Sequence, residues 1–276
     1  MDFKRIQVIF LITFVIIDVF LFSLFHRNEN VQTDDLNSGN QTNVVAEMHN
    51  DQISFHHRPS GVSGTGYYVA AKKTNGLHNE MQELANQNSH YNGGRLISTF
   101  KHPVTLNRRQ PHLTINRKLN DPTFILHGDQ YHYSSDLSSH DELVYVQQVP
   151  KNAENQDVFS KTAEIKFRLN DHYLEGYTQE YVNHVKTLHE KLNTISEKRA
   201  LTWLYQYNNI PNNTKIEWCH FAYTRLLSVK GNRVYIPTWV IALKTNNSPV
   251  HYRDVNAFTG SIIKHRNLSN NSKALG

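Results

Sequence analysis

Apolar residues predominate in one long stretch, residues 6–25, which reads IQVIFLITFVIIDVFLFSLF. As a helix, about 20 residues rise about 30 Å, the thickness of the hydrocarbon core of a bilayer. Lys4 and Arg5 precede the stretch, and the positive-inside rule then places the N-terminus in the cytoplasm. The pattern predicts a cytoplasmic segment at 1–5, one transmembrane helix at 6–25, and an extracytoplasmic remainder of the chain.

A cleaved secretory signal is the main alternative for this stretch. Such a signal has a shorter apolar core and a small-residue cleavage site after it. Here the apolar run passes directly into His26 and Arg27, with no site of that kind. The sequence therefore favours an uncleaved anchor in the cell membrane.

Two polar residues interrupt the apolar pattern of the anchor. Asp18 lies near the midpoint of the predicted span, where a carboxyl group costs a few kcal/mol unless it is protonated, hydrated or paired. Gln7 lies about three helical turns earlier and shares one face with Leu11, Phe14, Asp18 and Phe22. We interpret this face as a docking surface for the membrane helices of a partner. The alternative is that Gln7 lies among lipid headgroups and that Asp18 attracts water.

Composition divides the remaining chain. Residues 26–50 are rich in Asn, Gln, Thr, Asp and Ser, which predicts a flexible linker. Short strand and helix patterns follow twice, at 51–142 and at 143–265, which predicts two extracytoplasmic subdomains. Runs of strands with few helices indicate an α+β fold with antiparallel sheets. Residues 266–276 are expected to form a disordered tail.

In the first half, residues 52–57, 66–71 and 95–101 have the composition of strands. Apolar residues at helical spacing predict a helix over 77–91, which ends before the two glycines that follow Asn92. The signals over 102–141 are weak, with short pieces around three prolines.

In the second half, residues 143–149, 163–170 and 171–182 are predicted strands. Thr194 followed by Glu197 forms the sequence of a capping box, which predicts a helix that ends before Ile210 and Pro211.

A hairpin and a last strand close the predicted second half. The hairpin joins 215–229 to 233–243, and the last strand covers 250–258 with a short return at 261–264. Pro237 cannot donate a hydrogen bond to a sheet, so we expect it at an edge or a bulge.

Charge and cysteine content narrow the function classes. Lys and Arg exceed Asp and Glu by 29 to 24, a scattered excess that argues against nucleic-acid binding. The 17 histidines would add positive charge in acid, which could strengthen attraction to anionic wall polymers, although isolated surface imidazoles explain them too. The lone Cys219 excludes an internal disulfide, which suits a bacterial surface protein.

No catalytic motif or metal-ligand spacing is present, so the sequence predicts neither an enzyme, nor a cofactor, nor a metal site. Cys219 falls in a predicted strand, where an unpaired thiol is usually a core residue. Four aromatic residues fall on the C-terminal strands: Trp218, Tyr235, Trp239 and Tyr252. They can fill a core, and the alternative is an exposed aromatic surface that binds a peptide or a glycan.

Five segments carry a resemblance to a known family. The chain resembles the YycI family, also called WalI, over essentially its whole length. The segments are MDFKRIQVIFLITFVIIDVFLF (1–22), LEGYTQEYV (174–182), ISEKRALTWLYQYNNIP (195–211), YIPTWVIA (235–242) and YRDVNAFTGSI (252–262).

The resemblance implies a single-span regulator in low-GC Gram-positive bacteria, with a β-rich exterior domain related to part of YycH. Together with YycH, such proteins associate with the sensor histidine kinase WalK and adjust cell-wall metabolism through the response regulator WalR. The alternative is an exterior module that binds a peptide or a wall polymer and has a passive anchor.

Overall fold

The chain divides into two compact units, Met1–Asn50 and Asp51–Gly276. The computed structural model describes residues 3–30, 38–72, 76–148, 157–159, 162–188, 190–229, 231–246 and 248–263. The predicted tail at 266–276 and the side chains of Lys4 and Arg5 lie outside the described part of the chain.

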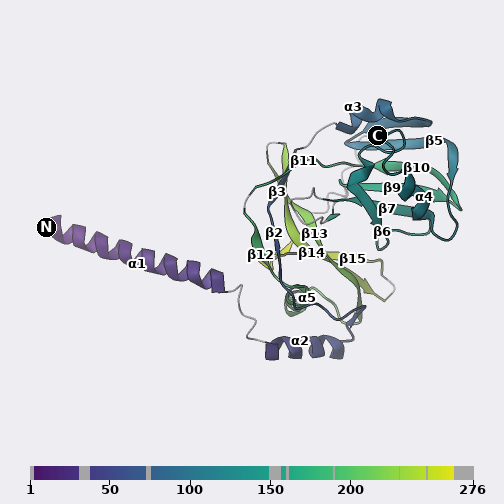
Figure 1. Ribbon diagram of the computed structural model, residues 1–276. Helices are drawn as coiled ribbons and strands as arrows, with labels where there is room; N and C mark the ends of the chain where they lie inside the picture. Colours follow the sequence, from purple (N-terminus) through teal and green to yellow (C-terminus); the bar gives the residue numbers. More distant parts are fainter. Residues whose placement is uncertain are drawn as a thin grey trace, which may run out of the picture. The chain divides into compact units, whose positions relative to one another are not determined.

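In the residues of the first unit that the structure describes, two helices are present (Figure 1). Helix α1 (Phe3–Asn30) contains the helix predicted at 6–25, and its side chains from 7 to 23 are all exposed. Among the helices as described, none combines the length and the apolar character needed to cross a membrane. Helix α2 (Ser38–Asn50) lies in the segment predicted to be a flexible linker, and its Val44 and Met48, one helical turn apart, are both buried.

The second unit contains a six-stranded sheet with the order β4-β5-β10-β9-β7-β6, in which all neighbours are antiparallel. Because β5 pairs with β10, the sheet takes strands from both predicted subdomains. The boundary expected between residues 142 and 143 therefore does not divide the structure into two separate sheets. The strands are β4 (Gln87–Asn92), β5 (Arg95–Thr105), β6 (Tyr131–Ser134), β7 (Glu142–Gln147), β9 (Glu164–Asn170) and β10 (Tyr173–Gln179).

One face of this sheet carries the larger hydrophobic core. Phe167 lies at its centre, with ring centroids 5.3 Å from Tyr145 and 5.6 Å from Tyr177, and all three are fully buried. Helix α4 (Pro111–Lys118) covers this face, since Ile115 is buried and Asn116 accepts a hydrogen bond from the Tyr145 hydroxyl at 2.8 Å. The opposite face carries the alternate, mostly polar side chains.

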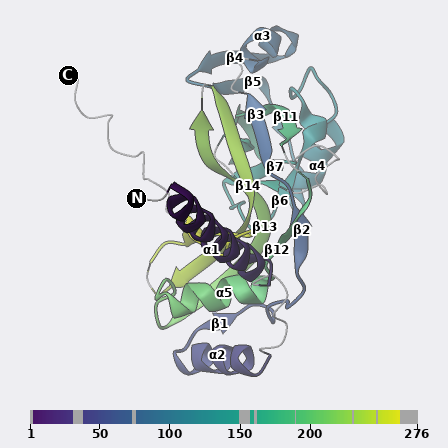
Figure 2. The same cartoon turned by 90° about the vertical axis from the view of Figure 1, so that its left-hand side faces the viewer.

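An eight-stranded sheet contains the predicted hairpin and adds strands on both sides of it (Figures 1 and 2). Its main strand order is β1-β13-β14-β15-β16. In addition, β8 pairs with β13, and β3 pairs with both β14 and β11. Only β1 and β8 run parallel to their neighbour among the described strands. The strands are β1 (Ser54–Phe55), β3 (Val69–Lys72), β8 (Asp157–Val158), β11 (Asn183–Thr187), β13 (Thr214–Val229), β14 (Asn232–Thr245), β15 (His251–Asn256) and β16 (Ile262–Ile263).

Pro237 lies in the interior strand β14, not at the expected edge or bulge. Its carbonyl accepts a hydrogen bond from Ala257 N at 2.9 Å, so its nitrogen also points away from β13. On that side, pairing changes from β3, which ends opposite Tyr235, to β15, which begins opposite Thr238. The missing N–H therefore falls in the gap between two ladders, where no partner strand requires it.

Helix α5 (Glu197–Gln206) confirms the predicted helix with a different cap. Ser196 is the N-cap and accepts a hydrogen bond from Arg199 N at 3.3 Å. Thr194 is unavailable because it ends β12 (Leu192–Thr194), which pairs with β2 (Gly64–Gly66). Glu197 is instead buried, and its carboxylate accepts a hydrogen bond from Ser60 N at 2.9 Å.

The helix predicted over 77–91 is only half present. Helix α3 (Gly76–Glu80) and the 3₁₀ helix η2 (Met81–Glu83) form its first part, but the second part is strand β4. Gln87 explains the change, because its buried amide donates to the carbonyls of Thr123 and Phe124 at 3.0 and 3.1 Å. In the weak region 102–141, the structure has α4, a 3₁₀ helix η3 (Gly128–Gln130) and β6.

Candidate functional site

The predicted partner face lies on α1. At 100° per residue, Gln7, Leu11, Phe14, Asp18 and Phe22 fall within an arc of about 80°. All five side chains are exposed. We call these five residues the α1 stripe, because they share one face of the helix.

The aromatic residues predicted on the C-terminal strands separate between two faces of the eight-stranded sheet. Trp218 and Tyr252 lie on one face, on either side of Ala242 in the register, with ring centroids 5.6 Å apart. Phe159 packs edge-on against both rings, and His220 lies 4.7 Å from Trp218. Phe159, Trp218, His220 and Tyr252 form the aromatic patch.

Tyr235 and Trp239 do not belong to this patch. Their positions on β14 alternate with Ala242, so they lie on the other face of the sheet. Tyr235 is 1% exposed and belongs to a buried cluster. Trp239 packs against Phe221 and donates its indole N–H to Ile195 O at 2.9 Å. The four residues therefore do not form one exposed surface, and Tyr235 fills a core, which was the first of the two interpretations.

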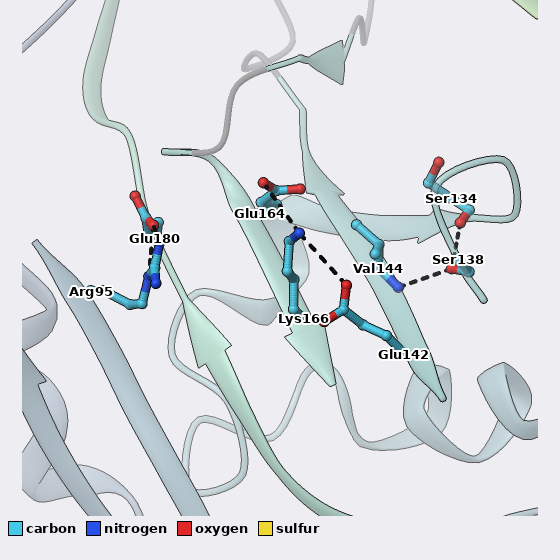
Figure 3. A network of polar contacts seen from close by, with 8 residues as sticks. All are labelled: Arg95, Ser134, Ser138, Glu142, Val144, Glu164, Lys166 and Glu180. Carbon is cyan, nitrogen blue, oxygen red and sulfur yellow. Dashed lines mark hydrogen bonds and ion pairs between the residues drawn. The ribbon is translucent and has the colours of Figure 1, made fainter. Parts of the chain in front are cut away.

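A row of charges from the six-stranded sheet adjoins the aromatic patch. In Figure 3, Lys166 on β9 lies between Glu142 and Glu164, with Nζ 3.6 and 4.0 Å from their carboxylate oxygens. These charges act on Tyr252. Partial burial raises the pKa of its phenol most, the Glu164 carboxylate raises this pKa further, and Lys166 lowers it. The patch therefore combines aromatic rings with both signs of charge.

His220 connects the patch to the loop after β6. Its Nε2 lies 2.7 Å from Asp136 Oδ2, and both side chains are about half exposed. The next residues of this loop are ordered by Ser138, whose hydroxyl donates to Ser134 O at 2.6 Å and accepts from Val144 N at 2.9 Å (Figure 3). The loop thus forms a fixed border of the patch.

Arg95 and Glu180 make a further ion pair on the six-stranded sheet (Figure 3). Arg95 donates from Nε and Nη2 to the same Glu180 oxygen, at 2.8 and 2.7 Å. Arg95 is about half exposed, so the ion pair adds little to the stability of the fold. The pair holds both charged side chains in place at the end of the sheet.

Two observations bear on catalysis. Over the described residues, no group of three or more His, Cys, Asp or Glu side chains is placed to hold a metal ion. Cys219 is buried on β13, and burial, together with the Glu197 carboxylate, raises the pKa of its thiol well above the ordinary value. A thiol in this state is a poor nucleophile. The arrangement of rings and charges in the patch suits reversible binding.

The burial of Cys219 has a measurable consequence. We expect its alkylation by iodoacetamide at pH 8 to be at least about tenfold slower than that of an exposed cysteine, because few molecules carry the thiolate. The matched control is Val62→Cys in a Cys219→Ala chain, since Val62 is 77% exposed. Equal rates in the two folded proteins, measured by mass spectrometry, would contradict the burial of Cys219.

Comparison with known families identifies the chain. The YycI protein family matches residues 31–258. The chain belongs to the YycI family. This confirms the resemblance seen in the sequence and links the chain to the regulatory system of the kinase WalK, also called YycG. YycI proteins are a regulatory family associated with membrane-anchored regulators, and they are not known as enzymes.

Other comparisons are less informative for this YycI protein. No curated protein matches the sequence. Among solved structures, an uncharacterized protein from Eubacterium rectale ATCC 33656 is similar to it at 11% sequence identity, with a TM-score of 0.41. The match covers 74% of this chain and 86% of that chain.

Sequence reasoning missed two members of the aromatic patch, Phe159 and His220. The position of His220, two residues after Trp218, is a usable signal, because alternate residues of a strand share a face. Phe159 gives no such signal, since it follows the short strand β8, which lies beside β13.

Proposed function

We propose that this YycI-family protein is a non-catalytic, membrane-anchored regulator of a WalK-type sensor histidine kinase, and that it acts with a YycH-type protein. The observation that carries the proposal is the family match over residues 31–258. Its output is control of cell-wall metabolism through WalR. The exterior domain and α1 both take part.

The anchor in this proposal is the apolar stretch at 6–25, with a cytoplasmic N-terminus and an extracytoplasmic second unit. Two facts support it: residues 6–25 are predominantly apolar, and the side chains from 7 to 23 are exposed. Within the α1 stripe, Asp18 and Gln7 supply polar groups that favour contact with another helix over contact with lipid.

Asp18→Leu tests this proposal. We expect the variant to co-purify about fivefold less kinase, because a polar contact between membrane helices contributes on the order of 1 kcal/mol. Output of a WalR-dependent reporter is expected to change with it. The control is Ile16→Leu, since residue 16 is exposed on the side of α1 opposite Asp18.

A helix exchange separates this proposal from the alternative. Residues 6–25 are replaced by an unrelated apolar span of the same length, so that any anchor remains but the α1 stripe is lost. Loss of kinase regulation is expected. Normal reporter output and normal co-purification with both Asp18→Leu and the exchanged helix would refute a role for α1 in partner recognition.

The aromatic patch supports a second candidate function, an exterior module that binds a peptide or a wall polymer above a passive anchor. Aromatic rings beside paired charges suit sugar rings and peptide side chains. In that case Trp218→Ala together with Tyr252→Ala would abolish function, and the helix exchange would leave it intact. The two experiments therefore distinguish the candidates.

A further inference from the structure

The turn end of the β13–β14 hairpin exposes aliphatic side chains. Residues 225–229 of β13 are all exposed, and Leu226, Leu227 and Val229 are 43%, 43% and 52% exposed. In the described part of the chain, the strands β1 and β8 pair with the outer side of β13 only as far as Tyr223. This end of the hairpin therefore extends past its neighbours on that side and presents its aliphatic side chains to solvent.

A β-bulge divides the side chains of this end between the two faces of the hairpin. Arg225 lies opposite Tyr235, and Leu227 lies opposite Val234, so that one extra residue, Leu226, falls between them. Neighbours along β14 point to opposite faces, and residues that lie opposite each other share a face. Leu227 and Val234 therefore lie on one face, and Arg225 lies on the other.

The two faces of this end differ in chemistry. Val229 continues the aliphatic face, two residues after Leu227, and Arg233 joins Arg225 on the basic face, because it alternates with Val234. Among the described residues, neither arginine forms an ion pair with a carboxylate. The hairpin end is our name for Arg225, Leu226, Leu227, Val229 and Arg233.

The charge around the hairpin end has one sign. No Asp or Glu occurs between Glu217 and Asp254 in the sequence. On β3, the exposed Lys72 lies opposite Asn232 and adds a further positive charge beside this end. An anionic surface is therefore attracted to it. The basic residues between Glu217 and Asp254 are Arg225, Lys230, Arg233, Lys244 and Arg253.

We propose that the hairpin end binds the surface of a bilayer that contains anionic lipids. Leu227 and Val229 enter the boundary between headgroups and acyl chains, as the apolar face of an interfacial segment does. The long side chains of the arginines reach the lipid phosphates from the other face. An anionic polymer offers no hydrocarbon to the aliphatic face, and a neutral bilayer offers no net charge to the arginines. An anionic bilayer supplies both.

A fluorophore at the hairpin end tests this contact. In the full-length Cys219→Ala chain, Ser228→Cys places a single thiol at an exposed position between Leu227 and Val229. The thiol is labelled with nitrobenzoxadiazole, whose emission rises in an apolar environment. The labelled chain is reconstituted with vesicles of phosphatidylglycerol or of phosphatidylcholine. We expect several-fold stronger emission, at shorter wavelength, with phosphatidylglycerol than with phosphatidylcholine.

The matched control site is Val62→Cys in the same Cys219→Ala chain, since Val62 is 77% exposed and lies outside the hairpin end. A label there should respond equally to the two lipids. No gain at residue 228, or the same gain at residues 62 and 228, overturns the proposal. A gain that requires an added protein also overturns it, because the hairpin end would then bind that protein.

Two charge substitutions test the role of the arginines. Arg225→Gln together with Arg233→Gln should reduce the emission gain several-fold at an unchanged melting temperature. The control is Lys215→Gln together with Lys244→Gln, which removes the same charge from an exposed cross-strand pair at the other end of the hairpin. Equal reductions from the two double variants would show an effect of net charge alone and would refute binding at the hairpin end.

Leu227→Ser together with Val229→Ser tests the aliphatic face. Both side chains are exposed, so the fold should be retained while the emission gain is lost. An undiminished gain would contradict insertion of this face into the bilayer. The proposal does not depend on the α1 stripe, so Asp18→Leu should leave the emission unchanged. Loss of kinase recognition and loss of lipid contact are therefore separate results.

Discussion

Gly260→Ala is expected to lower the free energy of unfolding by about 2 to 5 kcal/mol. Gly260 has φ +71°, and a Cβ at this position would lie 1.1 Å from Cζ3 of Trp203 on α5. The left-handed backbone costs an alanine about 1 to 2 kcal/mol, and overpacking a tight contact costs about 1 to 3 more. Trp203 cannot move away freely, because the Arg199 guanidinium lies over its ring at 4.9 Å.

Gly93→Ala is the matched control for this substitution. Gly93 has φ +61°, but a Cβ there would meet no atom within 4 Å. Its expected cost is the backbone part alone, about 1 to 2 kcal/mol. Urea denaturation, monitored by tryptophan fluorescence, gives the free energy of unfolding of both variants. If Gly260→Ala were no more destabilising than Gly93→Ala, this result would contradict the close contact between the β15–β16 turn and α5.

Phe167→Ala is expected to destabilise the protein by about 3 to 5 kcal/mol, the usual cost of removing a buried aromatic ring. Phe167 is fully buried on β9, where its ring contacts Tyr145 edge-on and Phe124 nearly in parallel. These partners come from separate elements, so no single movement closes the cavity. Chemical denaturation, monitored by circular dichroism, gives the difference in stability from the parent chain.

Arg168→Ala provides the control on the same strand. Arg168 follows Phe167 directly and points to the exposed face of the sheet. Its removal should change stability by no more than about 0.5 kcal/mol. Similar losses for the two variants would contradict the register of β9, since a slip of one residue exchanges the two faces.

Local sequence patterns predicted the elements whose stabilising contacts are themselves local. The helix at 6–25, the strand at 95–101 and the 215–229/233–243 hairpin all appear in the structure, because period and turn residues fix them within a few positions. The α1 stripe also follows from periodicity alone. In contrast, residues 87–91 belong to the helix predicted over 77–91 but form β4, because Gln87 finds hydrogen-bond partners more than thirty residues away.

The aromatic patch shows the same limit. Trp218 and Tyr252 could be grouped from the sequence, but the face on which Tyr235 and Trp239 lie depends on the register between β13 and β14. That register contains two shifts, and each shift changes which face later residues occupy. The sequence carries no mark of where they fall.

The pairing of β5 with β10 also sets an order of events during synthesis of the chain. Thr105 pairs with Tyr173, so the first strand emerges roughly 70 residues before its neighbour exists. At 5–20 residues per second this delay lasts on the order of ten seconds. During that time the β4–β5 hairpin exposes Leu96 and Phe100 to any chaperone or protease nearby. Until β10 is made, the β4–β5 hairpin is therefore a site at which the nascent chain depends on protection from its surroundings.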